Sequence, residues 1–181
     1  MSVATAVLER LTVPDYWLMA RVERWRPPRY LRRWMLVASR AGDGFLWYLA
    51  GLIVLWQGGT RRWPAFDAAA LAAGLGIAAF ESLKHGCRRS RPRLRLACGA
   101  KPPRAPDRYS FPSGHTLTAF AVSTALFYSY PRLEPLLLFL AVNIALSRIL
   151  LGLHFLSDVI ASTALGWTFG YIAAAWLLHP R

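Results

Sequence analysis

The stretch SRILLGLHFLSD (147–158) places an arginine, a histidine and an aspartate at the junction of two strongly apolar segments, residues 135–153 and 157–178. Each segment is near the roughly 20 residues that an α-helix needs to cross a bilayer. An ionisable group at a membrane edge is costly unless it has a role, so these three residues mark a functional-site hypothesis. This stretch therefore predicts membrane-spanning helices and the place of their site.

The composition supports a membrane protein with a single domain. The chain has 181 residues, of which 55% are hydrophobic, and it carries 8 Trp and a formal net charge of +13. We expect an all-α fold, a polytopic membrane bundle of five to six transmembrane helices. A basic chain also suggests nucleic-acid binding, but here the arginines cluster beside apolar segments. Membrane lipids and phosphate substrates are therefore the expected partners, and nucleic acid is not. The sequence gives no indication of the oligomeric state.

The predicted organisation has an N-terminal segment and a membrane core. Residues 1–33 are too charged to span and are expected to form an interfacial amphipathic segment, whereas residues 34–181 form the core. Five spans are expected, at about residues 34–57, 64–83, 113–130, 135–153 and 157–178. Because successive spans cross the membrane in opposite directions, this count places four points at the same membrane face. They are the end of the second span, the start of the third, the end of the fourth and the start of the fifth.

The residues at this common face suit the transfer of a phosphoryl group. The reaction needs positive charge on the non-bridging oxygens, and Lys84, Arg91 and Arg148 can supply it. Ser113 and Gly114 stand at the predicted start of a helix, where backbone N–H groups are donors to an anion. Glycine at this point would also let a phosphate approach the backbone closely.

Two histidines and a carboxylate can supply the remaining chemistry. His154 and Asp158 are four residues apart, so on a helical turn they share a face. Asp158 could then hold one ring nitrogen of His154 and leave the other free to attack phosphorus. His115 is the candidate general acid for the leaving oxygen. Because three cations can stabilise the charge, we expect no metal and no cofactor.

These residues resemble the type-2 phosphatidic acid phosphatase superfamily, which also includes vanadium haloperoxidases and glucose-6-phosphatase. Its pattern is Lys, six residues, Arg-Pro; then Pro-Ser-Gly-His; then Ser-Arg, five residues, His, three residues, Asp. The chain matches every position, over about residues 34–178, with the sets Lys84, Arg91-Pro92; Pro112, Ser113, Gly114, His115; and Ser147, Arg148, His154, Asp158.

The resemblance implies a lipid phosphatase of the membrane, and the three cations make a metal unnecessary. It implies that His154 forms a phosphohistidine, that Asp158 supports it and that His115 is the acid. It further implies that phosphate is bound by Lys84, Arg91, Ser113, Gly114 and Arg148. The expected substrates are phosphatidylglycerophosphate, phosphatidic acid or a polyprenyl pyrophosphate. The alternatives are a lipid phosphotransferase and a non-catalytic lipid-binding or transport protein; a haloperoxidase is disfavoured, since those are soluble.

Several residues near the motifs fall outside the pattern. Arg88, Arg89, Arg93 and Arg95 are expected to be headgroup-binding or solvated charges. Asp43, between two glycines, is expected at most to cap the first span and is given no catalytic role.

The orientation of the site has two conflicting indications. Arginines are more numerous on the motif side, which by the positive-inside rule favours the cytoplasm. Some of these cations are explained by phosphate binding, however, and the resemblance to bacterial lipid phosphatases favours the periplasmic face of the inner membrane. Cys87 and Cys98 in the long loop would allow a disulfide there. We expect the periplasmic face; labelling these cysteines in whole cells with an impermeant thiol reagent distinguishes the two.

Overall fold

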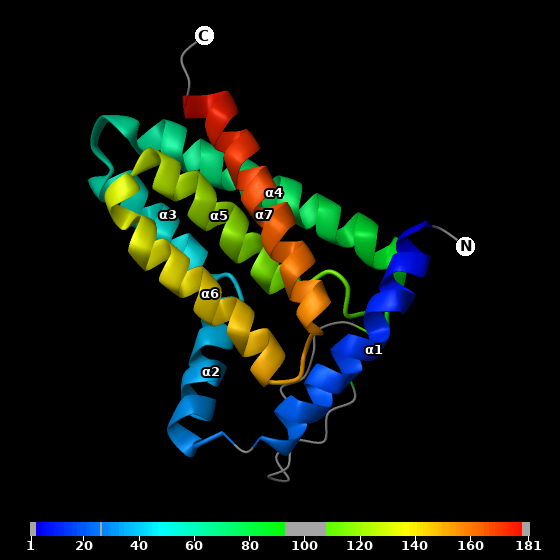
Figure 1. The fold of residues 1–181 in the computed structure, drawn as a ribbon. Helices are drawn as coiled ribbons and strands as arrows, with labels where there is room; N and C mark the ends of the chain where they lie inside the picture. The colour runs from blue at the N-terminus through cyan, green and yellow to red at the C-terminus, as the bar shows by residue number, and fades with distance from the viewer. Residues whose placement is uncertain (1–2, 26, 93–107, 179–181) are drawn as a thin grey trace.

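A computed structural model describes residues 3–25, 27–92 and 108–178; Arg93, Arg95 and Cys98 lie outside these ranges. Within them the chain folds into seven α-helices and no strand, so the prediction of an all-α fold is confirmed (Figure 1). The helices are α1 (Val3–Arg24), α2 (Arg29–Ala41), α3 (Phe45–Gln57), α4 (Arg62–Cys87), α5 (Gly114–Ser129), α6 (Glu134–Leu150) and α7 (Leu156–Leu178). Short 3-10 turns, Gly59–Arg61 and Pro131–Leu133, precede α4 and α6.

Helix α5 is the centre of the bundle. It is buried along nearly its whole length, and it packs against α7, α4 and α6. Figure 1 shows α5 between these neighbours, and α3 packs against α4. Three polar side chains within α5, Thr116, Ser123 and Thr124, are fully buried. Because α5 begins at Gly114, the central helix points its N-terminus toward the end of the bundle where the sequence motifs meet.

Glycines let α7 approach α5 closely. A Cβ at Gly166 would lie 2.5 Å from the backbone oxygen of Leu117, and one at Gly170 would lie 2.5 Å from that of Ala121. Backbone atoms cannot move aside as a flexible side chain can, so larger residues do not fit at either position. Small residues of this kind are the common means of packing helices in lipid, where no hydrophobic effect drives helices together.

The prediction of one continuous first span is wrong. Residues 34–57 do not form one helix, because the sequence Gly42-Asp43-Gly44 ends α2 and starts α3. Gly44 has φ +111°, a conformation that residues with a Cβ rarely adopt. Helix α2 also begins at Arg29, so the predicted boundary between residues 33 and 34 falls inside a helix.

The other predicted spans agree with the helices to within a few residues. Three segments in the described part of the chain are long and apolar enough to cross a membrane: Gly59–Cys87, Pro131–Leu150 and Leu156–Leu178. Helices α3 and α5, with 13 and 16 residues, are shorter than that. The predicted number of five to six spans is therefore not established by helix length alone.

The α5–α7 packing predicts opposite results for two glycine-to-alanine substitutions. Gly166→Ala should lower the thermal unfolding temperature in detergent, because the new methyl group meets the α5 backbone. Gly74→Ala, within α4, is the matched control, because a Cβ there meets nothing within 4 Å. Alanine favours a helix over glycine by about 0.5–1 kcal/mol, so the control should unfold at the same or a higher temperature. Equal transitions for both variants would contradict the packing described above.

Candidate active site

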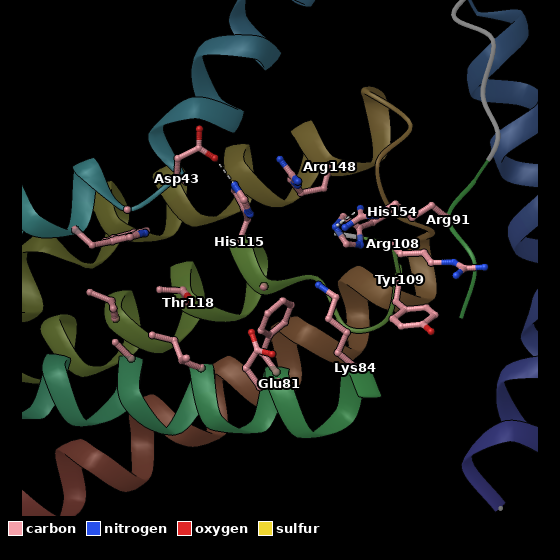
Figure 2. Close-up of a pocket in the computed structure, with 18 of the residues that line it drawn as sticks. Asp43, Glu81, Lys84, Arg91, Arg108, Tyr109, His115, Thr118, Arg148 and His154 are labelled. Atoms are coloured by element: carbon pink, nitrogen blue, oxygen red, sulfur yellow. Dashed lines mark hydrogen bonds and ion pairs between the residues drawn. The ribbon is translucent and has the colours of Figure 1, made fainter. Parts of the chain in front are cut away.

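The three motifs converge on one cavity of about 890 Å³ at the end of the bundle. Its polar end brings together Lys84, Arg91, Gly114, His115, Arg148 and His154. Its other wall is largely apolar and includes Trp47, Ala73, Ile77 and Val122 from α3, α4 and α5. In Figure 2 the labelled cations surround His154, and Thr118 lies farther along α5. The cavity can thus hold an anionic group at one end and an apolar chain at the other.

His154 is held in one tautomer by two neighbours. Its Nδ1 lies 2.6 Å from the carbonyl oxygen of Ser110, which can only accept a hydrogen bond. Its Nε2 lies 3.1 Å from a guanidinium nitrogen of Arg91, which can only donate. Nδ1 therefore carries the hydrogen, and Nε2 presents its lone pair. A neutral imidazole in this state has its nucleophilic nitrogen at the wall of the cavity.

The turn between α6 and α7 sets the position of His154. Gly152 follows the end of α6 with φ +69°, which reverses the chain sharply. The backbone N–H groups of Leu153 and His154 then donate to the carbonyl oxygen of Arg148, at 2.9 and 3.1 Å. The five residues between Arg148 and His154 are thus folded back on the helix end, so both side chains face the same cavity.

Asp158 does not make the expected hydrogen bond to His154. Its Oδ2 is 3.8 Å from Nδ1, beyond hydrogen-bond distance, and this oxygen accepts the backbone N–H of Phe155 at 2.9 Å. The partner of Nδ1 is instead the Ser110 carbonyl. Asp158 is fully buried near the ring, where it places a carboxylate close to His154 and holds the backbone N–H of Phe155.

The expectation that Arg89 is solvated or binds headgroups is wrong. Its side chain is only 8% exposed and forms ion pairs with Asp158 at 2.6 Å and with Asp15 at 2.7 Å. A buried carboxylate needs a partner of opposite charge, and Arg89 provides one for both aspartates. The one feature of the sequence that could have indicated a role for Arg89 is its position between Lys84 and Arg91, the two cations of the first motif.

The three predicted phosphate-binding cations line the cavity. Lys84 is buried, with Nζ 4.0 Å from the ring centre of Phe80. Arg91 donates to the carbonyl oxygen of Leu153 at 2.7 Å, beside His154. Arg148 is buried and donates to the hydroxyl of Ser39 on α2 at 2.6 Å. The role of Ser39 was not anticipated from the sequence.

Ser113 and Gly114 differ in their access to the cavity. Gly114 lines it, and a Cβ there would lie 2.9 Å from the ring of Phe80. Ser113 is fully buried and does not line the cavity. Its backbone N–H donates to Ser162 on α7 at 2.8 Å, and its hydroxyl pairs with Thr116. This N–H is therefore already satisfied within the protein, contrary to the expectation that it would face an anion.

His115 has an acidic partner that the sequence analysis did not assign. Its Nε2 lies 2.6 Å from Oδ1 of Asp43, which reaches it from the break between α2 and α3 (Figure 2). Gly42 makes this approach possible, because a Cβ there would lie 2.9 Å from the His115 ring. The one sequence signal was an aspartate between two glycines beside a long apolar stretch.

Burial lowers the pKa of His154 to about 4, and the charges of Arg91 and Arg148 act in the same direction, against the neighbouring Asp158 carboxylate. A lowered pKa keeps the ring neutral, with a free lone pair, at any pH well above 4. We therefore expect ¹⁵N NMR of the histidine-labelled protein in detergent to show His154 as the neutral Nδ1–H tautomer at pH 6. The signal is assigned by its loss in His154→Ala. Titration of His154 near pH 6.5, or an Nε2–H tautomer, would contradict this geometry.

Among proteins of similar sequence, two kinds of relative are informative. The decaprenylphosphoryl-5-phosphoribose phosphatase of Mycolicibacterium smegmatis is 32% identical over 133 residues, which cover 70% of each chain. The lipid A 1-phosphatase of Rhizobium etli is 37% identical over 65 residues, which are 36% of this chain and 28% of that protein. The match thus spans about a quarter of the lipid A enzyme.

Two solved structures have the same fold. The PAP2 type phosphatidylglycerolphosphate phosphatase from Bacillus subtilis, a transmembrane protein, superposes with a TM-score of 0.76 at 20% identity, covering 96% of this chain and 90% of that one. Aquifex aeolicus LpxE gives 0.73 at 25% identity, with 87% and 93% coverage. The prediction of a helical membrane bundle is therefore confirmed. Residues 65–180 also match the sequence model of the PAP2 superfamily. The chain belongs to the PAP2 superfamily.

Proposed function

We propose that this protein is an integral membrane phosphatase that hydrolyses a phosphomonoester or pyrophosphate on a lipid through a phosphohistidine at His154. The observation that carries the proposal is the state of His154, whose Nδ1–H is bound to Ser110 and whose Nε2 accepts a hydrogen bond from Arg91, in a cavity that Lys84 and Arg148 also line. Names of the relatives, which are phosphatases of lipid substrates, support the same reaction class. The cavity has cationic side chains at one end and an apolar wall at the other, which suits a lipid phosphate whose chain lies among the helices.

In the first step, Nε2 of His154 attacks phosphorus and the bond from phosphorus to the leaving oxygen breaks. Lys84, Arg91 and Arg148 neutralise the non-bridging oxygens, which carry the developing charge. Arg91 moves from Nε2 onto a phosphate oxygen, and this frees the lone pair for attack. His115 gives a proton to the leaving oxygen, so the lipid product departs as an alcohol, or as a lipid monophosphate if the substrate was a pyrophosphate.

In the second step, water replaces the imidazole on phosphorus. His115, now unprotonated, accepts a proton from the water as its oxygen bonds to phosphorus and the P–N bond breaks. Inorganic phosphate leaves, and His154 returns to its neutral state. Asp158 stabilises the positive charge that the His154 ring carries while it is phosphorylated. No step requires a metal, because the three cations carry the charge.

We propose phosphatidylglycerophosphate, phosphatidic acid or a polyprenyl pyrophosphate as the substrate. A cavity of about 890 Å³ has room for a headgroup and the first part of a chain, and the remainder would lie along the exposed apolar surface of α3 and α4. Exposed Tyr48 and Ile77 mark this surface beside the cavity.

The first test is a panel of these three lipid phosphates in detergent, with release of free phosphate as the readout. Wild type should release phosphate from at least one of them without any acceptor present, which separates a hydrolase from a phosphotransferase. EDTA should leave most of the activity. His154→Ala should remove turnover by at least about 10³-fold, because a nucleophile has no substitute. A folded His154→Ala protein with wild-type rates would refute the assignment.

The pairing of Asp43 with His115 leads to a second test. Asp43 orients the His115 ring and stabilises its charge, so Asp43→Asn should weaken general-acid catalysis, which contributes about 10²–10⁴-fold. We expect kcat/KM to fall at least about tenfold for the lipid substrate but less than about threefold for p-nitrophenyl phosphate, whose leaving group needs no proton. Asp67→Asn on α4, away from the cavity, is the matched control. Equal losses on both substrates would exclude this role for Asp43.

A further inference from the structure

Helix α1 places a buried carboxylate against the support of His154. Asp15 is 5% exposed, although α1 lies outside the part of the chain that matches the family, residues 65–180. Its Oδ1 accepts the backbone N–H of Ser157 at 3.2 Å. Its Oδ2 accepts a guanidinium N–H of Arg89 at 2.7 Å and the hydroxyl of Ser157. The N-terminal helix is thereby bonded to the first turn of α7, where Asp158 stands.

Arg89 connects Asp15 to the proposed nucleophile by two routes. Through its side chain, Arg89 donates to Asp158 at 2.6 Å and to Ser157 at 2.7 Å. Through its backbone, the carbonyl oxygen of Arg89 accepts the N–H of Ser110 at 2.8 Å, and the carbonyl of Ser110 in turn accepts Nδ1–H of His154. Movement of Arg89 would therefore disturb both the charge behind His154 and the hydrogen bond that sets its tautomer.

Apolar side chains fix this network in place. The guanidinium carbon of Arg89 lies 4.3 Å from the ring centre of Phe155, and Tyr16 on α1 packs edge-on against the same ring at 5.1 Å. Phe155 is 1% exposed and Met19 on α1 is 2% exposed within the same hydrophobic cluster. Since water has little access here, charges within the network act on one another at low dielectric.

The charges of this network sum to −1. Two carboxylates, Asp15 and Asp158, share the single cation of Arg89, and the three side chains are 6%, 0% and 8% exposed. If Arg89 faced Asp158 alone, it would cancel that charge. Because Asp15 takes part of the Arg89 hydrogen bonding, Arg89 cancels less of the Asp158 charge. That negative charge lies on the Nδ1 side of the His154 ring, which becomes positive when it is phosphorylated.

Resting on the proposed function, we propose that Asp15 is a positioning residue of the active site, which acts through Arg89 to keep Asp158 negative and the His154 ring in place. The N-terminal helix is then part of the catalytic apparatus and not only a membrane-surface segment. Arg89 is a positioning residue in the same sense, since it reaches His154 through Asp158 and Ser110.

A double-mutant cycle on purified protein tests this proposal, with the best-hydrolysed lipid of the panel as substrate. Asp15→Asn should lower kcat about tenfold while KM changes less than about threefold, as for other residues that orient a reacting side chain. Asp15→Glu should retain kcat within about threefold of wild type, because the charge is kept. Arg89→Met should lower kcat about a hundredfold, because it leaves two buried carboxylates without a cation.

The decisive comparison is the double variant. In the Arg89→Met background, Asp15→Asn removes one of two uncompensated carboxylates and restores a net charge of −1, so it should raise kcat at least about fivefold. A residue needed only for folding would change the amount of folded protein and not invert its effect on kcat. Thermal unfolding in the same detergent gives the folded fraction, and Asp67→Asn serves as the control for loss of a carboxylate elsewhere.

The possible outcomes separate this proposal from the proposed function. Wild-type kcat in Asp15→Asn, or the same loss from Asp15→Asn in both backgrounds, would overturn the positioning role even if His154→Ala is inactive. Turnover by His154→Ala would overturn the proposed function and this inference with it. Should Asp15→Asn fail to fold alone, the comparison of Arg89→Met with the double variant still decides.

Discussion

Charged groups buried at the ends of apolar helices must find partners, and this constraint organises the whole site. Arg89 lies between two buried aspartates and Arg148 donates to a buried serine, while Asp43, which is exposed, pairs with the largely buried ring of His115. Each pairing joins helices that are far apart in the sequence, because one helix rarely carries both partners. The polar contacts therefore fix the position of α1, α2 and the break before α3 relative to the central helices.

The central helix α5 makes that arrangement possible. Its neighbours approach closely because glycines and alanines face it, as at Gly166 and Gly170. The close approach brings the N-terminus of α5 beside the ends of α4 and α6 and the start of α7, where the ionisable residues lie. Bulkier residues at Gly166 or Gly170 would instead meet the α5 backbone and hold the two helices apart.

The proposed chemistry depends on the position and tautomer of His154, which backbone groups set more than side chains do. The Ser110 carbonyl selects the tautomer, the Arg148 carbonyl holds the backbone of the turn, and the N–H of Phe155 holds Asp158. Backbone groups in a packed turn have few alternative positions, so they preorganise the ring without the entropy cost of long side chains. Asp158, whose carboxylate lies near the ring, then contributes negative charge and not a hydrogen bond to the ring.

Hydrophobic length and motif spacing are local properties, so they predict the helical membrane fold, most helix limits and the residues that meet at the cavity. The sequence also led to Lys84, Arg91, Arg148, His115 and His154, all of which line one cavity. The partners of the site residues, in contrast, are visible only in the folded chain: Asp43 for His115, Ser110 for His154, and Asp15 and Asp158 for Arg89. The break at Gly42-Asp43-Gly44 also escaped the hydrophobic pattern, since its apolar neighbours masked it. The partners lie between 44 and 74 residues apart in the sequence. No local pattern encodes such pairings, because they follow from how the helices pack around α5.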